Sequence, residues 1–202
     1  MEADHEAVAN QALEECKAHV LPMLTGAGWK NDTNKDGVEI CVRDGPTGMP
    51  IVKVVCTIRA SAETILNYLT EPQNRPLWMD KIKTCEILHS FPSEARIVRE
   101  IVDAPFPVSK REFIYAAKVY HEPNGVLVVH KSVEIGRPEG EAVRGEVLGR
   151  VVLLETLGGE TRLTNVASVD PKGNIPGFIK KKSAKGVGKA ILSLKRLIEK
   201  NH

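Results

Sequence analysis

Residues 174–200 have the pattern of apolar and polar positions that one long amphipathic helix requires. The apolar residues recur mostly at steps of three and four, which places them on one helical face. These residues are Phe178, Ile179, Val187, Ile191, Leu194, Leu197 and Ile198. The opposite face carries eight lysines and arginines and a single acid, Glu199. The sequence therefore predicts a C-terminal helix with an apolar face that covers other elements and a cationic face that could meet an anionic partner.

Strand-like segments fill most of the middle of the chain. In each of them β-branched or apolar residues alternate with polar ones, and turn-forming residues separate one segment from the next. The predicted strands span residues 38–43, 51–59, 83–91, 95–103, 110–120, 126–135, 143–157 and 161–170. Because joints such as 122–125 and 158–160 are tight, we expect consecutive strands to pair antiparallel. The polar stretch 31–37, NDTNKDG, has the composition of a hairpin loop.

Helical patterns lie at the start of the chain and between the second and third predicted strands. Asp4 can cap a first helix within residues 1–25, and Ser61 can cap a short helix over 61–69. Prolines then interrupt the chain between residues 71 and 78. Helices at both ends of a run of antiparallel strands predict an α+β fold.

A sheet with this many strands tends to curl, and the helix at 174–200 is suited to close its open side. The chain has 202 residues, of which 42% are hydrophobic. That length is enough for one domain with a substantial core, so we expect residues 1–202 to form a single unit.

Charge is unevenly distributed along the chain, although the formal net charge is only +2. The first 15 residues hold five acids and no lysine or arginine, whereas the C-terminal helix is basic. This asymmetry fits an anionic surface partner, such as a membrane, and it fits a solvated helix face equally well.

The four cysteines give no sign of a disulfide framework or of a metal site. They are isolated, with no CxxC pair and no histidine at zinc spacing. We expect free thiols in a reducing compartment and no bound metal. The sequence has no signal-peptide pattern and no apolar run long enough to span a membrane, so we expect a cytoplasmic protein.

No constellation of catalytic residues is apparent. The six histidines are scattered singly, and the sequence has neither a Walker loop nor a Rossmann glycine pattern. Residues 185–189, KGVGK, look like a phosphate loop only superficially, because they follow a helical pattern rather than a strand. Aromatic residues are few and do not interleave with a basic strand face, so no nucleic-acid partner is expected. The sequence predicts neither an enzyme nor a bound cofactor.

Two predicted strands have faces that can line either a filled core or a cavity. The strand at 110–120 places four residues on one face: Phe113, Tyr115, Ala117 and Val119. The strand at 143–157 likewise places four on one face: Leu148, Arg150, Val152 and Leu154. Because a small residue such as Ala117 leaves room beneath a long helix, a cavity is the sharper of the two interpretations.

Two motifs in this order of elements resemble those of the START (StAR-related lipid-transfer) domain family. Residues 106–113, FPVSKREF, are similar to the family's Pro-x-Ser-x-Arg-Asp-Phe segment. Residues 170–178, DPKGNIPGF, are similar to its Asp-x-Lys-Gly-x-x-Pro turn before the last helix. The segments 143–146 and 75–78 also fit, and the resemblance covers nearly the whole chain. It implies a helix-grip fold, in which a curved antiparallel sheet holds one lipid beneath a C-terminal lid helix.

The resemblance also implies a binding site. The chain is most similar to the phosphatidylcholine-transfer branch, in which Arg75 matches an arginine that contacts the lipid phosphate and Arg150 lies near a polar cavity residue. Sterol binders of the family place a buried arginine at the position of Ala117, so that cation is missing here. The expected lipid-binding residues are Arg75, Trp78, Glu100, Phe113, Tyr115, Ala117, Leu148, Arg150, Phe178, Val187 and Ile191. The expected membrane-docking residues are Phe106, Lys181, Lys182 and Lys185.

Each of the two arginines also has a simpler interpretation. Arg75 or Arg150 could form a salt bridge with a carboxylate such as Glu100 or Asp103, or it could be exposed to solvent. A buried guanidinium without a partner is costly, whereas a lipid phosphate can accept two hydrogen bonds from it. The sequence leaves both interpretations open.

The resulting hypothesis is a monomeric cytoplasmic protein that holds one lipid and exchanges it through transient contact with an anionic membrane. A phospholipid is the first candidate, and a sterol, a fatty acid or another hydrophobic small molecule is the alternative. An enzyme of the wider helix-grip superfamily is a third class, which access of Glu100, Tyr115 and His130 to one cavity would favour. Gly186 and Gly188 are expected to weaken the lid helix, since each glycine costs about 1 kcal/mol relative to alanine.

Overall fold

The computed structural model describes residues 2–104, 106, 108–123, 125–137 and 140–201, with the backbone alone for residues 2, 3 and 177–183. The helices are α1 (Glu2–Thr25), α2 (Ala62–Thr70), the 3₁₀ turn η1 (Pro72–Asn74), α3 (Arg75–Trp78) and α4 (Gly177–Asn201). The strands are β1 (Lys30–Lys35), β2 (Val38–Arg43), β3 (Ile51–Ile58), β4 (Ile82–Ser90), β5 (Arg96–Val102), β6 (Arg111–Glu122), β7 (Gly125–Ser132), β8 (Val143–Arg144), β9 (Glu146–Leu157) and β10 (Glu160–Asp170).

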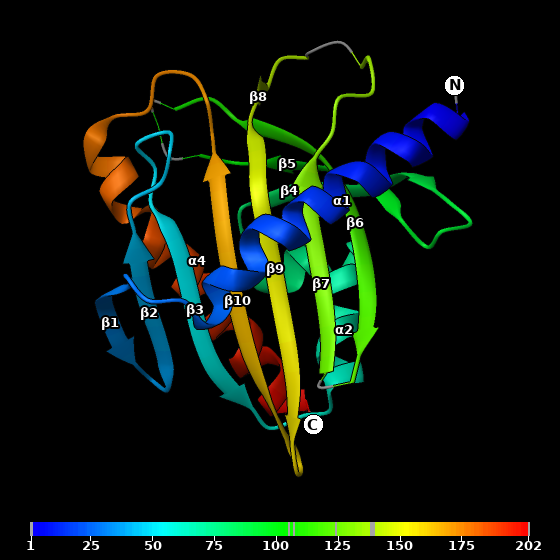
Figure 1. The fold of residues 1–202 in the computed structure, drawn as a ribbon. Coiled ribbons are helices and arrows are strands. Elements are labelled where there is room, and N and C mark those ends of the chain that lie inside the picture. Colours follow the sequence, from blue (N-terminus) through cyan, green and yellow to red (C-terminus); the bar gives the residue numbers. More distant parts are fainter. Residues whose placement is uncertain (1, 105, 107, 124, 138–139, 202) are drawn as a thin grey trace.

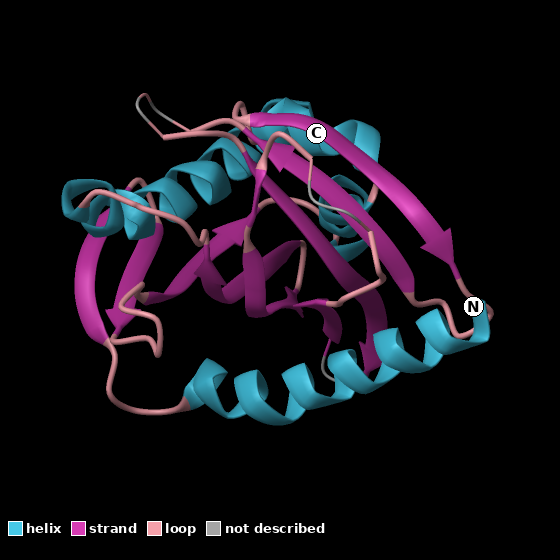
Figure 2. Cartoon of the chain, turned by 90° about the horizontal axis from the view of Figure 1, so that it is seen from above, coloured by secondary structure: helices cyan, strands magenta, loops and turns pink. Residues whose placement is uncertain are grey.

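The strands form one curved sheet in the order β1-β2-β3-β10-β9-β7-β6-β5-β4. Neighbours in this order pair antiparallel, and the short β8 pairs parallel with β6. Because β10 pairs with both β3 and β9, it joins the three N-terminal strands to the rest of the sheet. Figure 2 shows α1 on one side of the curled sheet and α4 on the other. The predicted α+β class and the antiparallel pairing are confirmed.

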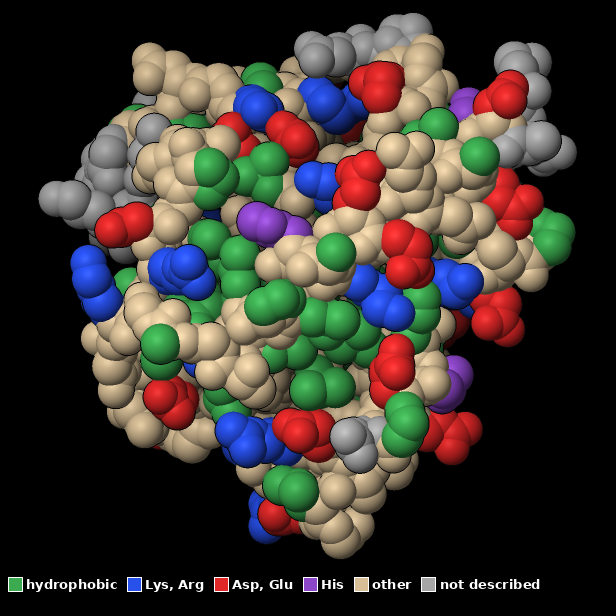
Figure 3. Space-filling view, viewed as in Figure 1, with side chains coloured by type: hydrophobic (Ala, Val, Ile, Leu, Met, Phe, Trp, Pro, Cys, Tyr) green, Lys and Arg blue, Asp and Glu red, His purple; other side chains and the backbone are tan. Residues whose placement is uncertain are grey.

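Helix α1 crosses the outer face of the sheet over β6, β7 and β9 (Figure 1). The apolar side of α1, including Leu13 and Val20, packs there against strand residues such as Val129 and Val151. Contact is close at Gly149, where a Cβ atom would lie 2.9 Å from a Val20 methyl carbon. On this face, Figure 3 shows hydrophobic side chains gathered near the centre, with charged side chains around them.

The C-terminal half of α4 packs on a filled core on the inner face. Ile191, Leu194 and Ile198 are fully buried there among residues of β2, β3, β9, β10 and α2. Gly188 also lies close to the sheet, since a Cβ atom at this position would be 2.0 Å from Ile40 Cδ1. Among the described side chains, none lies within 4 Å of a Cβ built on Gly186. Close packing against Ile40 therefore explains a glycine at position 188 without any role in helix flexibility. Gly186 alone remains a candidate position at which α4 could bend.

Part of the cationic face of α4 is used inside the fold. Lys195 Nζ donates hydrogen bonds to the Thr57 carbonyl at 2.6 Å and to Glu199 at 2.7 Å. Arg196 forms an ion pair of 2.9 Å with Asp36 in the β1–β2 turn. Two of the positive charges in the C-terminal half thus fasten α4 to the sheet, whereas Lys185 and Lys189 in the N-terminal half and Lys200 at the end are exposed.

Three predicted boundaries were wrong. Residues 30–35 form strand β1, not a hairpin loop, and the turn is limited to Asp36 and Gly37, which both have positive φ. The predicted strand at 143–157 is divided at Gly145, against which the Phe113 ring packs so closely that no Cβ fits. The last helix begins at Gly177, after Pro176, and not at residue 174.

Candidate functional site

A cavity of about 540 Å³ lies between the curved sheet and the middle of α4. Strands β5, β6, β7, β9 and β10 form its floor, and α3 and α4 complete its wall. Much of this wall is apolar: Trp78, Met79, Val102, Phe113, Val147, Ala167, Val169, Val187, Ala190 and Ile191. We call this cavity the α4 lobe.

A second cavity, of about 440 Å³, adjoins the first between α2, the β4–β5 hairpin and β6. We call it the α2 lobe. The two lobes share Arg75, Tyr115 and His130 as wall residues. Each lobe is within the range of roughly 300–1,000 Å³ that is usual for small-molecule sites.

Arg75 and Glu100 form a buried ion pair beside this shared wall. Arg75 opens α3, and its guanidinium carbon lies 4.6 Å from the centre of the Trp78 ring. Arg75 Nε donates a 2.8 Å hydrogen bond to Glu100 Oε1, and the two side chains are 5% and 8% exposed. Burial alone would raise the pKa of Glu100, but the attraction of Arg75 outweighs it, so this pKa is lowered. The protein itself therefore balances the charge of Arg75.

Arg150 lines the α4 lobe without an acidic partner. Its Nε donates a 2.9 Å hydrogen bond to Asn165 Oδ1, and it forms no ion pair with any carboxylate of the described residues. Burial, with repulsion from Arg75 in addition, lowers the pKa of Arg150 to about 10. Arg150 therefore stays charged at neutral pH. It places a cation in the cavity from β9, although the cation expected of a sterol binder is absent at Ala117.

Three buried polar atoms around Arg150 have no hydrogen-bond partner among the described residues: Arg75 Nη1, His130 Nδ1 and Asn165 Nδ2. His130 lies opposite Arg150 in the register of β7 and β9, and its ring packs edge-on against Tyr115 at 5.3 Å. Burial, followed by repulsion from the two arginines, holds the pKa of His130 well below its usual value, so the imidazole is neutral. Since each unpartnered buried polar atom is costly, this group of atoms suits a ligand that carries acceptor oxygens.

Most residues expected to bind lipid do meet in one place. Eight of them line the α4 lobe: Arg75, Trp78, Glu100, Phe113, Tyr115, Arg150, Val187 and Ile191. Ala117 lines the α2 lobe instead. Leu148 lines neither lobe, because a bulge leaves it without a partner on β10 and places Val147 in the wall. The side chain of Phe178 lies outside the described residues.

Two of the expected membrane-docking residues can be placed. Phe106, in the loop between β5 and β6, is 96% exposed. Lys185 is exposed on the N-terminal half of α4. The side chains of Lys181 and Lys182 lie outside the described residues. Over the part of the chain that the structure covers, no helix is long and apolar enough to cross a membrane.

The two sequence motifs of the family resemblance meet at Arg111. Its Nε donates a 2.7 Å hydrogen bond to the Pro171 carbonyl, and its Nη2 donates one of 3.1 Å to the Lys172 carbonyl. Lys172 and Gly173 both have positive φ, which turns the chain from β10 toward α4. Arg111 thus holds the turn that leads into α4, and the motifs have a structural role near the cavity.

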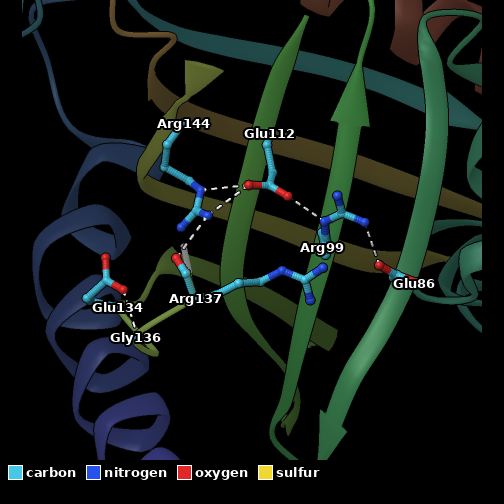
Figure 4. A network of polar contacts seen from close by, with 7 residues as sticks. All are labelled: Glu86, Arg99, Glu112, Glu134, Gly136, Arg137 and Arg144. Atoms are coloured by element: carbon cyan, nitrogen blue, oxygen red, sulfur yellow. Dashed lines mark hydrogen bonds and ion pairs between the residues drawn. The ribbon is translucent and has the colours of Figure 1, made fainter. Parts of the chain in front are cut away.

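Glu112, the second motif residue, lies on the face of β6 opposite Phe113 and Tyr115. Figure 4 shows its carboxylate between Arg99 of β5 and Arg144 of β8. This network joins neighbouring strands and the short β8 on the side away from the cavity. Glu112 therefore supports the sheet and does not face a ligand.

Val147 lines the α4 lobe and Asn165 lies beside Arg150 behind this wall, and neither was singled out from the sequence. Asn165 is fully buried and orients Arg150 through its amide oxygen. A signal for it exists in the sequence, since Asn165 shares its strand face with Leu163 and Ala167 and is polar among apolar neighbours. Val147 has no such signal, because its place depends on a bulge between β9 and β10.

Comparisons with known proteins agree with this architecture. Residues 11–197 match the model of the START domain family. Human StAR-related lipid transfer protein 5 is similar in structure, with a TM-score of 0.88 at 19% identity over 98% of this chain and 99% of that one. Human STARD10 gives a TM-score of 0.77 at 19% identity over 90% of this chain and 78% of that one.

A STAR-related lipid transfer protein fragment from Xanthomonas axonopodis gives a TM-score of 0.75 at 17% identity, over 85% of this chain and 99% of that one. A search of curated proteins found no match. At these identities the solved structures establish the helix-grip fold, and they do not favour the phosphatidylcholine-transfer branch over others. Because the family model matches most of its length, the chain belongs to the START domain family.

Proposed function

We propose that this protein holds one phospholipid in the α4 lobe and exchanges it with membranes. The observation that carries the proposal is Arg150, a charged guanidinium that lines an apolar cavity and has no carboxylate partner among the described residues. A lipid phosphate would neutralise this charge and accept hydrogen bonds from it. Acyl chains against the apolar wall would add roughly 0.8 kcal/mol for each buried CH₂ group.

Charge balance favours a phospholipid over a sterol. A sterol hydroxyl could accept a hydrogen bond from Arg150, but it would leave the positive charge uncompensated in the interior. The missing arginine at Ala117 is a weaker argument, since Arg150 supplies the cavity with a half-buried cation from another strand. A fatty acid carboxylate would satisfy Arg150 as a phosphate does, so the ligand must be identified directly.

Membrane contact is proposed where α3, α4 and the β5–β6 loop expose apolar and cationic side chains. Leu77 is 60% exposed and lines the α4 lobe, and Phe106 is almost fully exposed. Lys185 and Lys189 are exposed on α4 and have no ion pair among the described residues. Apolar side chains that insert and cations that face an anionic leaflet together support reversible docking, after which α4 would move to release the lipid.

We place this exchange in the cytoplasm and assign it to a monomer. All four cysteines are free thiols, and three of them, Cys16, Cys41 and Cys56, are buried. Free thiols are usual in a reducing compartment.

Native mass spectrometry after incubation with mixed liposomes tests the ligand. Wild-type protein should carry the mass of one phospholipid, and Arg150→Met should lose it. The matched control is Arg162→Met, which removes a half-exposed arginine of the neighbouring strand and should bind as wild type does. Failure of the wild-type protein to take up any lipid would refute the proposal, and a bound sterol or fatty acid would replace the phospholipid in it.

A vesicle transfer assay tests the docking surface. Reversing the charge at Lys185 and Lys189 should slow transfer from anionic vesicles, and added salt should slow the wild-type protein in the same way. Lys30→Glu, on the distant edge strand β1, is the control and should transfer at the wild-type rate. Equal rates for all three proteins would remove the docking surface from the proposal.

An enzyme is the second candidate, because Glu100, Tyr115 and His130 do line one cavity. Their protonation states argue against acid–base chemistry, which works best with a group whose pKa is near the working pH. The pKa of Glu100 is lowered and the carboxylate is already paired, the pKa of Tyr115 is well raised, and the pKa of His130 is well lowered. Incubation with ester and glycoside lipids, followed by product analysis, tests this candidate. A product that wild type forms and His130→Gln does not would establish it.

A further inference from the structure

The α2 lobe has no role in the binding mode proposed above, in which phosphate lies at Arg150 and acyl chains lie under α4. It nevertheless adjoins that site, since Arg75, Tyr115 and His130 line both lobes. Two unpartnered buried atoms, Arg75 Nη1 and His130 Nδ1, belong to this shared wall. A phosphate held by Arg150, which lies opposite His130 in the sheet register, would therefore lie beside this shared wall.

The walls of the two lobes differ in chemistry. Apolar residues dominate the α4 lobe, which suits hydrocarbon chains. The α2 lobe combines buried apolar residues, such as Val98 and Val128, with polar residues toward the surface. Those polar residues carry both signs of charge, for instance Glu94 and Lys118. This mixture suits a polar or zwitterionic group better than an acyl chain.

We infer that the α2 lobe receives the head-group substituent of the bound lipid, the part that is esterified to the phosphate on the side away from the glycerol. The inference rests on the proposed function and makes it more specific. Phosphodiester lipids with a polar substituent would occupy both lobes, whereas phosphatidic acid, whose phosphate carries no substituent, would bind with the α2 lobe unfilled. Because surface residues form the outer wall, the lobe tolerates substituents of different size.

Two alanines allow each lobe to be narrowed separately. Ala117 on β6 lines the α2 lobe, and Ala167 on β10 lines the α4 lobe, opposite Arg150 in the sheet register. Ala117→Leu and Ala167→Leu therefore add the same side-chain volume on either side of the phosphate position. The milder Ala117→Val covers the case in which leucine prevents folding, and the melting temperature of each variant shows whether it has folded.

The probes are vesicles that contain equal amounts of phosphatidylcholine and phosphatidic acid, and native mass spectrometry of the re-isolated protein reads out the bound lipids. The wild-type protein should carry both. Ala117→Leu should reduce bound phosphatidylcholine by about tenfold or more, since overfilling a packed site commonly has that effect, and should leave phosphatidic acid within about twofold. Ala167→Leu should reduce both lipids.

Each other outcome has a definite meaning. If a folded Ala117 variant keeps both lipids or loses both equally, the α2 lobe does not hold the substituent and the inference is overturned. The same follows if the wild-type protein carries phosphatidic acid alone. If the wild-type protein carries neither lipid, the proposed function fails, and that result is distinct from failure of the inference.

Discussion

Arg75 and Arg150 line the same cavity from different elements, and their guanidinium groups have different partners. Arg75 comes from a short helix, stacks on Trp78 and is neutralised by Glu100 on β5. Arg150 comes from a central strand and is held by the neutral amide of Asn165. The charge of Arg75 is thus neutralised within the protein, whereas the charge of Arg150 remains available to a ligand in the cavity.

Their different partners suggest different roles for the two arginines, with Arg75 contributing to stability and Arg150 to ligand binding. Removing one member of a buried ion pair leaves the other charge buried without a counter-ion. The Arg75–Glu100 pair therefore acts as a structural element. A charge that lines a cavity without an ion-pair partner, as Arg150 does, opposes folding until something neutralises it, and sites of this kind are usually retained for function. The family resemblance alone would place a lipid phosphate at Arg75, whereas charge balance favours Arg150 for the proposed phosphate contact.

The largest expected effect comes from breaking the paired arginine. Glu100→Gln leaves Arg75 buried without a counter-ion, so the free energy of unfolding should fall by roughly 3–5 kcal/mol. Glu86→Gln is the matched control, because Glu86 is a half-exposed partner of Arg99 and should cost about 1 kcal/mol or less. Urea denaturation measures both. Equal losses for the two variants would show that the buried pair has no special structural role.

Removing the unpaired arginine should have the opposite sign. Arg150→Met replaces a half-buried cation with an apolar side chain of similar length, so the free energy of unfolding of the lipid-free protein should rise by about 1–3 kcal/mol. Lipid binding should be lost in the same variant. A thermal melt of delipidated protein measures the first effect. A less stable Arg150→Met protein would indicate that Arg150 is mainly structural.

The sequence was sufficient for the order of elements and for one wall of the cavity. The alternation in β6 correctly placed Phe113 and Tyr115 on the inner face, because strand periodicity is a local property. Strand β1 was missed since nearly all of its side chains are exposed, so no apolar alternation marks it. Leu148 was misplaced because a bulge depends on the partner strand.

The partners of the two arginines could not be predicted for a related reason. Arg75 and Glu100 are 25 residues apart, and no local pattern indicates that α3 and β5 bring them together. The sequence therefore left a salt bridge and a phosphate contact open for both arginines. The structure assigns the salt bridge to Arg75 and gives Arg150 neither a carboxylate nor full exposure.

The charges of Arg75 and Arg150 also affect how stability depends on pH, through their effect on His130. Its pKa is well lowered in the folded protein, first by burial and then by Arg150 and Arg75. Below about pH 6.5 the unfolded chain takes up a proton that the folded protein does not, so stability falls as the pH is lowered, by at most ~1.4 kcal/mol per pH unit.

His130→Gln should flatten this decline in urea denaturation curves taken from pH 7 to pH 5, and Arg150→Met should flatten it partly. Substitution of the exposed His121 by glutamine is the control and should leave the decline as in wild type. An unchanged slope in His130→Gln would mean that His130 does not contribute to the acid sensitivity.

The smallest change in stability is expected when Arg150 receives an acidic partner, so that the two arginines no longer differ in this respect. Asn165→Asp keeps the shape of the side chain and gives Arg150 the carboxylate partner that Arg75 already has. Because the desolvation of a new buried pair offsets most of its attraction, the free energy of unfolding should change by only about 1 kcal/mol. Phospholipid binding should nevertheless fall, since the new carboxylate occupies the guanidinium and repels a phosphate. A stable Asn165→Asp protein that binds phospholipid as well as wild type would show that the free charge of Arg150 is not what recognises the lipid.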